Sequence, residues 1–236
     1  MNYKENLSSS VLFTFTPALD YLIDMLVDGI RPRYSFESLP NNSKHYLLTM
    51  KCFCDIPLSK TKVHLDWYGN YGLGIRQETL KKRGVTPVFY VHETSVKEII
   101  KPLLENPKSE KLVAFTKKHF GTTYRLYDDN TYKRTSRKFY DEREWRYVPT
   151  NAKLEWFPKN YGIQEGLMLA RKRNEEQPVL QGSIQINFQD IEYIIIKDLK
   201  DVATIRKALR KKFPDEVDFE LLMTKVLTAK QIKKDF

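Results

Sequence analysis

The sequence Val11-Leu12-Phe13-Thr14-Phe15-Thr16-Pro17 predicts a strand that leads directly into a helix. Its first five residues are β-branched, aromatic or otherwise apolar, a composition typical of strands. We expect Thr16 to cap the helix and Pro17 to occupy its first position, where the missing N–H costs nothing. Gly29 then ends the helix. Apolar residues recur between these limits at helical spacing, at Leu19, Leu22, Ile23, Leu26 and Val27.

Strand and helix patterns follow one another without an internal repeat in the rest of the chain. A capping-box pattern, Ser95-x-x-Glu98, begins one of the expected helices. We therefore predict a single α+β domain over 1–236, with a mixed or mostly antiparallel sheet and segregated helices. Further strands are expected over 50–56, 86–91 (buried) and 191–196, helices over 77–84, 95–104 and 109–119, and a helical C-terminal part over about 198–236.

Length and composition indicate a globular protein of the cytoplasm. The chain has 236 residues and a net charge of +10. It contains no apolar run near the ~18–20 residues of a membrane span and no signal-peptide pattern at its start. Cys52 and Cys54 are the only cysteines, and their spacing along a strand suits neither a disulfide nor a zinc site. We expect two reduced thiols, no membrane segment and no metal.

The segment from Lys117 to Lys138 combines positive charge with aromatic rings, and we predict a loop there. Asp128 and Asp129 are its only acidic residues. Basic groups bind phosphates and flat rings stack on bases, so this composition favours contact with nucleic acid or an acidic partner. The alternative is a solvated loop that is basic by chance. The candidate contact residues are Lys117, Lys118, Arg125, Lys133, Arg134, Arg137 and Lys138, interleaved with Phe120, Tyr124, Tyr127, Tyr132 and Phe139.

The segment Phe139-Tyr140-Asp141-Glu142-Arg143-Glu144-Trp145-Arg146-Tyr147 mixes charges and large aromatics. Strand alternation after Glu142 places Glu144 and Arg146 on one face and Arg143, Trp145 and Tyr147 on the other. Each face then carries an ionisable group. Two interpretations stay open, a functional site or a solvent-edge strand with ion pairs.

Four ordered stretches together resemble the AbiGi family of bacterial abortive-infection proteins, over about residues 10–196. The resemblance implies a role in phage resistance, because the family is described as the antitoxin partner of a phage-resistance pair. A toxin or phage component is the implied partner. The stretches are Leu12–Thr16 with Gly29–Glu37, Cys52–Leu58 with His64 and Tyr68–Ile75, Gly84–Tyr90, and Phe139–Tyr147.

A looser resemblance connects the first strand, helix and glycine, followed by a Tyr-Ser strand, to ADP-ribosyltransferase-like folds. It implies NAD as cofactor and a late catalytic Glu, to which Glu142-Arg143-Glu144 is similar. Thr14 stands where those enzymes carry His or Arg. The implied catalytic candidates are Glu144 and Glu142, and the implied cofactor-binding candidates are Thr14, Tyr34, Tyr68, Tyr71 and Arg143.

Glu144 is the residue on which the enzyme hypothesis depends. In such a site it would stabilise an oxocarbenium-like transition state, and burial beside Trp145 would raise its pKa. We expect its side chain to lie in a cleft with Tyr68, Tyr71 and Arg143. The alternative is an ion pair to Arg146 or Arg143, worth under about 1 kcal/mol if exposed.

Two other candidates are weaker. His64 lies near Asp55 and Asp66 in sequence and could act as a base or a metal ligand, although such a His is more often hydrogen-bonded structure. Cys54 has no basic neighbour to activate it, so we expect it in the core.

Three hypotheses follow for function. The first is a binding module that engages a toxin or phage component. The second is an ADP-ribosyltransferase-like enzyme using NAD, and the third is a nucleic-acid-binding regulator.

Overall fold

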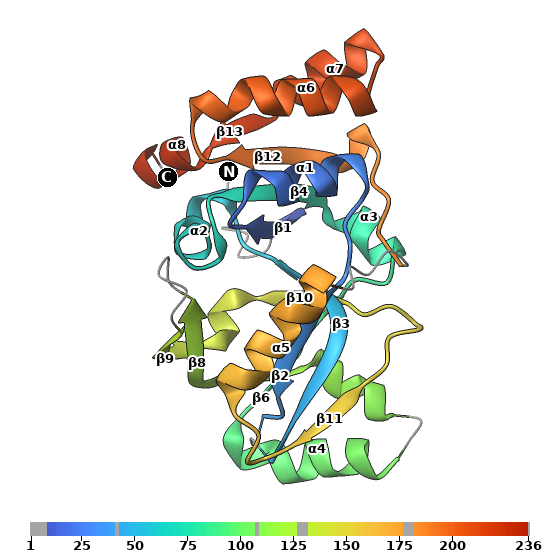
Figure 1. Cartoon of the computed structure of the whole chain (residues 1–236), viewed down its shortest axis with the longest axis vertical. Helices are drawn as coiled ribbons and strands as arrows, with labels where there is room; N and C mark the ends of the chain where they lie inside the picture. The colour runs from blue at the N-terminus through green and yellow to red at the C-terminus, as the bar shows by residue number, and fades with distance from the viewer. Residues whose placement is uncertain (1–8, 41–42, 107–108, 127–131, 177–181, 236) are drawn as a thin grey trace, which may run out of the picture. The chain divides into compact units, whose positions relative to one another are not determined.

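The computed structural model describes residues 9–40, 43–106, 109–126, 132–176 and 182–235 (Figure 1). The chain is an α+β protein with mostly antiparallel strands, as predicted. Its residues group into two compact units. Whether these units make up one domain, as the sequence predicted, stays a prediction. Unit 1 consists of Met1–Arg31, Phe53–Gly84 and Ser183–Phe236, and unit 2 consists of Pro32–Cys52 and Val85–Gly182.

Unit 1 is built on a sheet with the strand order β13-β12-β4-β1. These strands are β1 (Val11–Thr16), β4 (Tyr71–Arg76), β12 (Ile191–Ile196) and β13 (Val226–Thr228). Neighbours are antiparallel except β12 and β13, which run parallel. The end of β3 (Lys44–Cys54) joins beside β1, where Cys54 pairs with Phe13.

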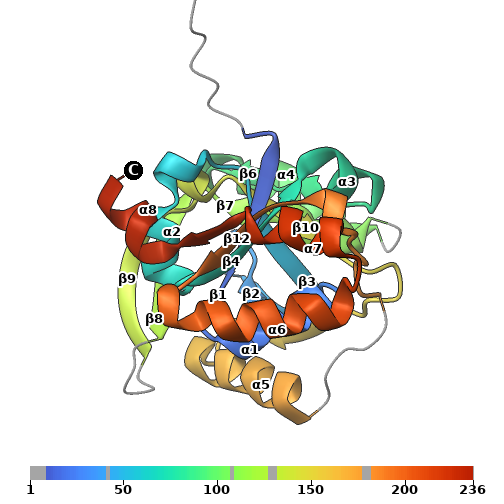
Figure 2. The same cartoon turned by 90° about the horizontal axis from the view of Figure 1, so that it is seen from above.

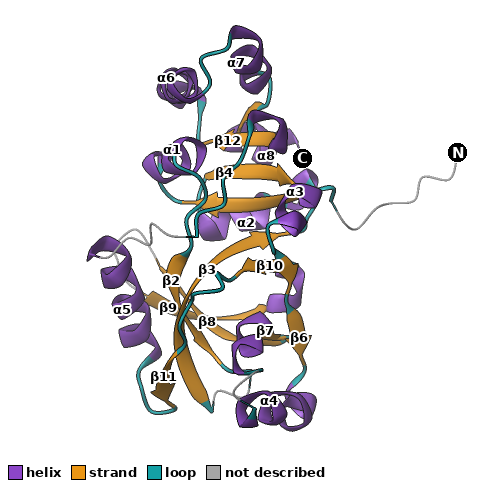
Figure 3. Cartoon of the chain, turned by 90° about the vertical axis from the view of Figure 1, so that its right-hand side faces the viewer, coloured by secondary structure: helices purple, strands orange, loops and turns teal. Residues whose placement is uncertain are grey.

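Helices cover both faces of this sheet (Figures 2 and 3). On one face, α1 (Leu19–Val27) packs beside α6 (Val202–Lys212), which is followed by α7 (Glu216–Met223). On the other face lie α2 (Lys62–Tyr68) and α8 (Ala229–Asp235), whose Leu65 and Ile232 pack into the cluster around Phe13. The short α3 (Gln77–Lys82) ends before Gly84, as predicted. The buried residues of α1 and α6 are apolar as well, so apolar side chains are packed on both faces of the sheet.

The strand-to-helix connection corrects the predicted cap. Thr16 is the last residue of β1 and pairs with Tyr71 of β4, so α1 begins at Leu19 with Ala18 as its N-cap. Thr16 is part of the sheet because its backbone is paired with β4, so it does not adopt the N-cap position of the helix. Gly29 ends the helix as predicted, with a φ of +90° that favours glycine.

The glycines before and within β4 allow β1 to approach close to their backbone. Gly69 has a φ of +117°, and a Cβ on it would lie 2.3 Å from the carbonyl oxygen of Thr16. A Cβ on Gly72 would lie 2.8 Å from the ring of Phe15. Gly69 and Gly72 have no side chain, and β1 occupies the space that a Cβ would need.

Unit 2 is built around β3, which is flanked by β2 (Arg33–Ser38) and β11 (Glu155–Pro158). The order β3-β10-β5 continues through β10 (Glu144–Tyr147) and β5 (Thr86–Pro87). A parallel pair joins β6 (Phe89–Val91) to β7 (Thr116–Lys118), and a hairpin joins β8 (Phe120–Leu126) to β9 (Tyr132–Lys138). Two helices complete the unit, α4 (Val96–Glu105) and α5 (Ile163–Glu176).

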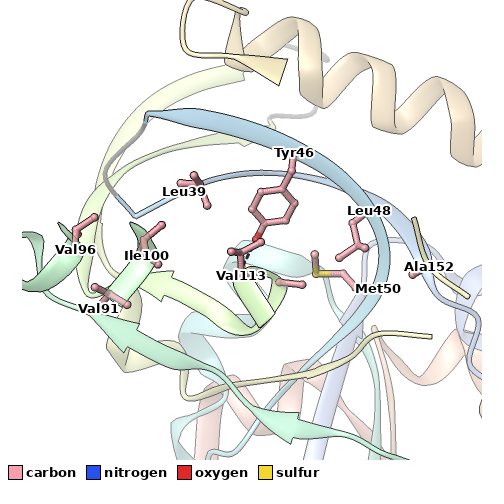
Figure 4. Close-up of a cluster of buried hydrophobic side chains, with 10 residues drawn as sticks. Leu39, Tyr46, Leu48, Met50, Val91, Val96, Ile100, Val113 and Ala152 are labelled. Carbon is pink, nitrogen blue, oxygen red and sulfur yellow. Dashed lines mark hydrogen bonds between the residues drawn. The ribbon is translucent and has the colours of Figure 1, made fainter. Parts of the chain in front are cut away.

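The apolar core of unit 2 gathers β3 and α4 (Figure 4). Tyr46 is buried there and its hydroxyl donates to the carbonyl of Val113 at 3.4 Å. The predicted capping box is absent, because the Ser95 side chain makes no cap hydrogen bond. The expected helix 109–119 is a 3-10 turn (Glu110–Phe115) followed by β7. The expected buried strand 86–91 is two short strands, in which Phe89 is 57% exposed.

The expected loop from Lys117 to Lys138 is mostly the β8–β9 hairpin. Its Thr and aromatic residues are strand formers, a signal that the charge pattern concealed. Tyr127, Asp128 and Asp129 lie outside the described residues. In unit 1, Val226, expected on a helix, begins strand β13 instead.

No helix in the described ranges is both long and apolar enough to cross a membrane. Cys52 and Cys54 carry thiols that are not joined in a disulfide.

Candidate functional site

Strand β10 carries its charges inward. Glu144 is 5% exposed and Arg146 is fully buried, whereas Trp145 and Tyr147 are half-buried. The predicted alternation is therefore confirmed, but the interpretation as a solvent-edge strand is wrong. The charged face of this strand is its interior face.

Arg146 is the centre of a buried ion-pair network. Its Nε lies 2.7 Å from Glu144 Oε1, and a second nitrogen lies 3.5 Å from the carboxylate of Glu37 on β2. The remaining terminal nitrogen donates to the carbonyl of Ala114 at 2.6 Å. The guanidinium thus satisfies its donors on three sides, as a buried Arg must.

Lys117 on β7 joins the two glutamates of the Glu-x-Glu motif. Its Nζ donates to Glu142 at 2.7 Å and to Glu144 at 2.5 Å. Arg137 on β9 lies 3.1 Å from the other oxygen of Glu142. We call these six side chains the charged cluster, since three acids balance three bases: Glu37, Glu142, Glu144, Lys117, Arg137 and Arg146.

The cluster keeps Glu144 ionised. Burial alone would raise the pKa of this carboxyl, but the charges of Arg146 and Lys117 outweigh burial and hold the pKa below its usual range. The sequence-based expectation of a raised pKa is therefore wrong. Burial raises the pKa of Cys52 well above its ordinary value, and the charge of Glu144 adds to that effect. Tyr90 completes the surroundings, because its hydroxyl accepts the Glu144 backbone N–H at 2.8 Å.

This arrangement suits structure better than acid–base chemistry. Glu144 accepts from Arg146 and Lys117, and Glu142 pairs with Lys117 and Arg137. A catalytic carboxylate needs an oxygen directed at its substrate, and both carboxylates here are occupied by the protein's own cations. The ion pair to Arg146, the alternative interpretation of Glu144, is present, and it is buried rather than exposed.

The cofactor candidates of unit 1 do not converge. Thr14 is buried on the same face of the sheet as Tyr71, whose hydroxyl donates to Asp201 at 3.2 Å. Burial and the Asp201 charge raise the pKa of Tyr71 to about 12. Tyr68 contacts His64, which packs on Phe15, and Phe15 points to the opposite face from Thr14.

The cofactor candidates of unit 2 serve local structure. Tyr34 lies under the guanidinium of Arg173, 5.6 Å from the ring centre. Arg143 has a φ of 45° at the turn before β10. The predicted cleft joining Glu144 and Arg143 to Tyr68 and Tyr71 would combine residues of different units, and it stays a prediction.

His64 and Cys54 lie in the interior of unit 1. His64 is 5% exposed on α2, between the rings of Phe15 and Tyr68. The Cys54 thiol lies 3.5 Å from the carbonyl of Phe13 in the core, as expected. Within the ranges that the structure describes, no three His, Cys, Asp or Glu side chains gather as metal ligands.

The candidate basic residues have different surroundings. Lys117 and Arg137 belong to the charged cluster and are turned inward. Lys133 and Arg134 are exposed on β9, and Lys138 forms an exposed ion pair of 3.3 Å. Lys118 donates to the carbonyl of Thr122 at 3.0 Å. The Arg125 backbone lies in β8, but its side chain is outside the described part.

A pocket of about 600 Å³ in unit 2 was not predicted. Its wall includes three histidines and three cations from separate elements. No local pattern in the sequence joins them, since they lie on β3, around β6 to β9 and after β11. They are His45, His92, His119, Lys118, Arg134 and Lys159.

The fold and these sites define an α+β protein whose candidate catalytic carboxylates are locked in ion pairs and whose second unit holds a basic pocket. A family model described as "Putative abortive phage resistance protein AbiGi, antitoxin" matches residues 32–197. The chain therefore belongs to the AbiGi family, as the motifs indicated. The match includes all of unit 2 and the segments 53–84 and 183–197 of unit 1.

A curated relative supports this membership. The abortive phage resistance protein AbiGi of Lactococcus lactis subsp. cremoris is 22% identical over 225 residues, which cover 82% of this chain and 90% of that protein. No solved structure matches the chain.

Proposed function

We propose that the protein acts in abortive infection as a binding module that engages a cognate toxin or a phage component. Family membership supports the phage-resistance role, and the description of the family as an antitoxin supports toxin binding. The observation that favours binding over catalysis is the charged cluster, in which Lys117, Arg137 and Arg146 occupy Glu142 and Glu144. A cytoplasmic location, where cysteines stay reduced, fits this role.

The exposed basic residues of strand β9 make this strand the part of unit 2 best suited to contact a partner. Lys133 and Arg134 are exposed there, next to the inward-turned Arg137. Exposed cations of this kind steer an acidic partner surface and make association dependent on salt. The proposed partner surface is therefore acidic.

Co-production with the product of the neighbouring gene tests the proposal. We expect the two proteins to co-purify and the Kd to rise with salt. Lys133→Ser with Arg134→Ser should weaken the complex and flatten its salt dependence. The matched control is Lys207→Ser with Lys211→Ser, which removes two exposed charges from α6 and should change nothing.

A direct enzyme assay supplies the opposing outcome. Purified wild-type protein, with and without its partner, would be incubated with labelled NAD. Turnover of NAD or transfer of label would overturn the binding-only proposal and support the transferase hypothesis.

A nucleic-acid-binding regulator is the second candidate, and two exposed aromatics favour it. Phe120 and Tyr140 are 54% and 52% exposed beside the hairpin, where rings can stack on bases. Salt-dependent binding of single-stranded RNA or DNA, lost in the Lys133/Arg134 variant and without toxin binding, would favour this candidate.

A further inference from the structure

We propose that the pocket of unit 2 binds a nucleoside phosphate, through its phosphate group on the cationic wall and its base on the aromatic rim. This inference goes beyond the proposed partner binding and does not depend on it. The pocket volume of about 600 Å³ is suitable for a small ligand. Such sites in proteins measure about 300–1,000 Å³.

The charge of the wall selects an anion. Lys118, Arg134 and Lys159 line the pocket, and none of the described residues that line it is acidic. Neither Arg134 nor Lys159 forms an ion pair with a described residue. A guanidinium beside ammonium groups matches a phosphate, because Arg binds two oxygens at once and Lys supplies a point charge.

Lys118 differs from its neighbour Lys117 in a way that supports this assignment. Lys117 contacts two carboxylates, whereas the Lys118 ammonium has a hydrogen bond to the carbonyl of Thr122 at 3.0 Å. Burial lowers the pKa of Lys118, and the charge of Lys117 adds to this effect against the opposing charge of Glu37. A bound phosphate would supply the missing negative charge.

The three histidines have two different roles: one holds the protein backbone beside the pocket, and two are placed to contact the ligand. His45 is 3% exposed, with Nδ1 2.8 Å from Ser38 Oγ and Nε2 3.3 Å from the carbonyl oxygen of Lys159. It therefore fixes the segment that carries Lys159. His92 and His119 lie on the wall with ring centres 6.2 Å apart, so their ring N–H groups are additional candidate donors to phosphate oxygens.

The aromatic groups indicate a nucleoside rather than inorganic phosphate alone. Phe120 and Tyr161 line the pocket, and Phe120 is 54% exposed. His119 is stacked on Tyr140 with ring centres 5.3 Å apart. Exposed flat rings beside a cationic wall suit a base attached to a phosphate.

Calorimetric titration of the full chain tests the proposal. The probes are adenosine 5′-monophosphate, uridine 5′-monophosphate, inorganic phosphate and adenosine. We expect both nucleotides to bind, phosphate to bind more weakly, and adenosine not to bind. Arg134→Ser and Lys159→Ser should each weaken nucleotide binding roughly tenfold or more, since each removes a charged hydrogen bond.

Matched variants separate this site from the proposed partner surface. Lys159 lies outside the hairpin, so Lys159→Ser should reduce nucleotide binding and leave partner binding intact. Lys133→Ser should do the reverse, since Lys133 does not line the pocket. Thermal unfolding checks that each variant is folded, and Arg134→Lys should restore part of the affinity.

Two probes distinguish the source of the ligand. A short RNA with a 5′-phosphate is compared with the same RNA bearing a 5′-hydroxyl. Preference for the phosphorylated RNA over the free nucleotide identifies an RNA end, and the opposite preference identifies a free nucleotide. Equal binding of adenosine and its monophosphate, or unchanged affinity in Arg134→Ser and Lys159→Ser, would overturn the proposal.

Discussion

Strand β4 of unit 1 and strand β10 of unit 2 are both buried, but different forces hold them. In β4 the interior is apolar or glycine, from Tyr71 to Ile75. In β10 the interior residues are Glu144 and Arg146. Apolar burial is non-directional and tolerates adjustment, whereas a buried ion pair needs each partner in place. The two units should therefore respond differently to mutation and to pH.

Leu22→Asp should have the largest effect. Leu22 is fully buried on α1, and an unpaired carboxylate there has no partner in an apolar interior. We expect a loss above about 4 kcal/mol in the free energy of unfolding and insoluble expression. The control is Tyr21→Asp, since Tyr21 is 40% exposed and should accept the charge. Cooperative unfolding of soluble Leu22→Asp would contradict the assigned face.

Arg146→Met should come next. It leaves Glu144 buried beside Lys117 alone and should cost about 3–5 kcal/mol, as measured by urea unfolding. Adding Glu144→Leu should restore most of this loss, because two acids and two bases of the cluster remain, and Glu37, which loses its Arg146 partner, is 26% exposed. Lys138→Met is the surface control and should cost less than about 1 kcal/mol. A double variant no more stable than Arg146→Met would contradict the ion-pair account of β10.

Stability at acid pH should depend on the same charged cluster. The folded state lowers the pKa of Glu144, so its contribution to stability is present above the unfolded value of about 4.3 and is lost as pH falls further, through the lower folded pKa. Urea unfolding between pH 7 and pH 3 should therefore show a steeper loss for wild type than for the Glu144→Leu/Arg146→Met variant. Parallel curves would show that Glu144 carries no such linkage.

The sequence predicted much of the fold where the signal was local. The strand, the helix face with Leu22 and Leu26, and the stop at Gly29 follow from residues within a few positions of each other. Thr16 was wrongly predicted as a cap because its pairing with Tyr71 is set by a segment far along the chain. The hairpin was missed for a different reason, since its charges concealed its strand-forming residues.

The candidate site was predicted less well. Alternation correctly placed Glu144 and Arg146 on one face, but it could not identify that face as interior, because Lys117 and Glu37 complete the cluster from other strands. The pocket gave no local signal, since His92 and Lys159 meet only in the fold. Long-range contacts determine both features.

Gly74→Ala should destabilise the apolar strand β4 by less than the substitutions above. A Cβ there would lie 2.8 Å from the ring of Phe13 and 3.0 Å from that of Tyr193. Overpacking of this kind should cost about 1–3 kcal/mol in thermal or urea unfolding. The control is Gly162→Ala, whose Cβ would lie nearest the exposed end of the Glu165 side chain. That end can turn away at the loss of its hydrogen bond from the Gly162 N–H, so a smaller loss is expected. Equal losses would show that β4 has space that the packing does not indicate.

Arg134→Ser should have the smallest effect on stability. Arg134 and Arg137 lie three residues apart on β9, yet Arg134 is exposed at the pocket, whereas Arg137 is 11% exposed and pairs with Glu142. Because exposed charges contribute little, Arg134→Ser should stay within about 0.5 kcal/mol of wild type in urea unfolding. Arg137→Ser leaves Glu142 with one fewer partner in the interior and should cost about 1–3 kcal/mol. Equal losses would mean that both faces of the hairpin serve structure. A clear difference would leave Arg134 available to a ligand or partner and assign Arg137 to the charged cluster.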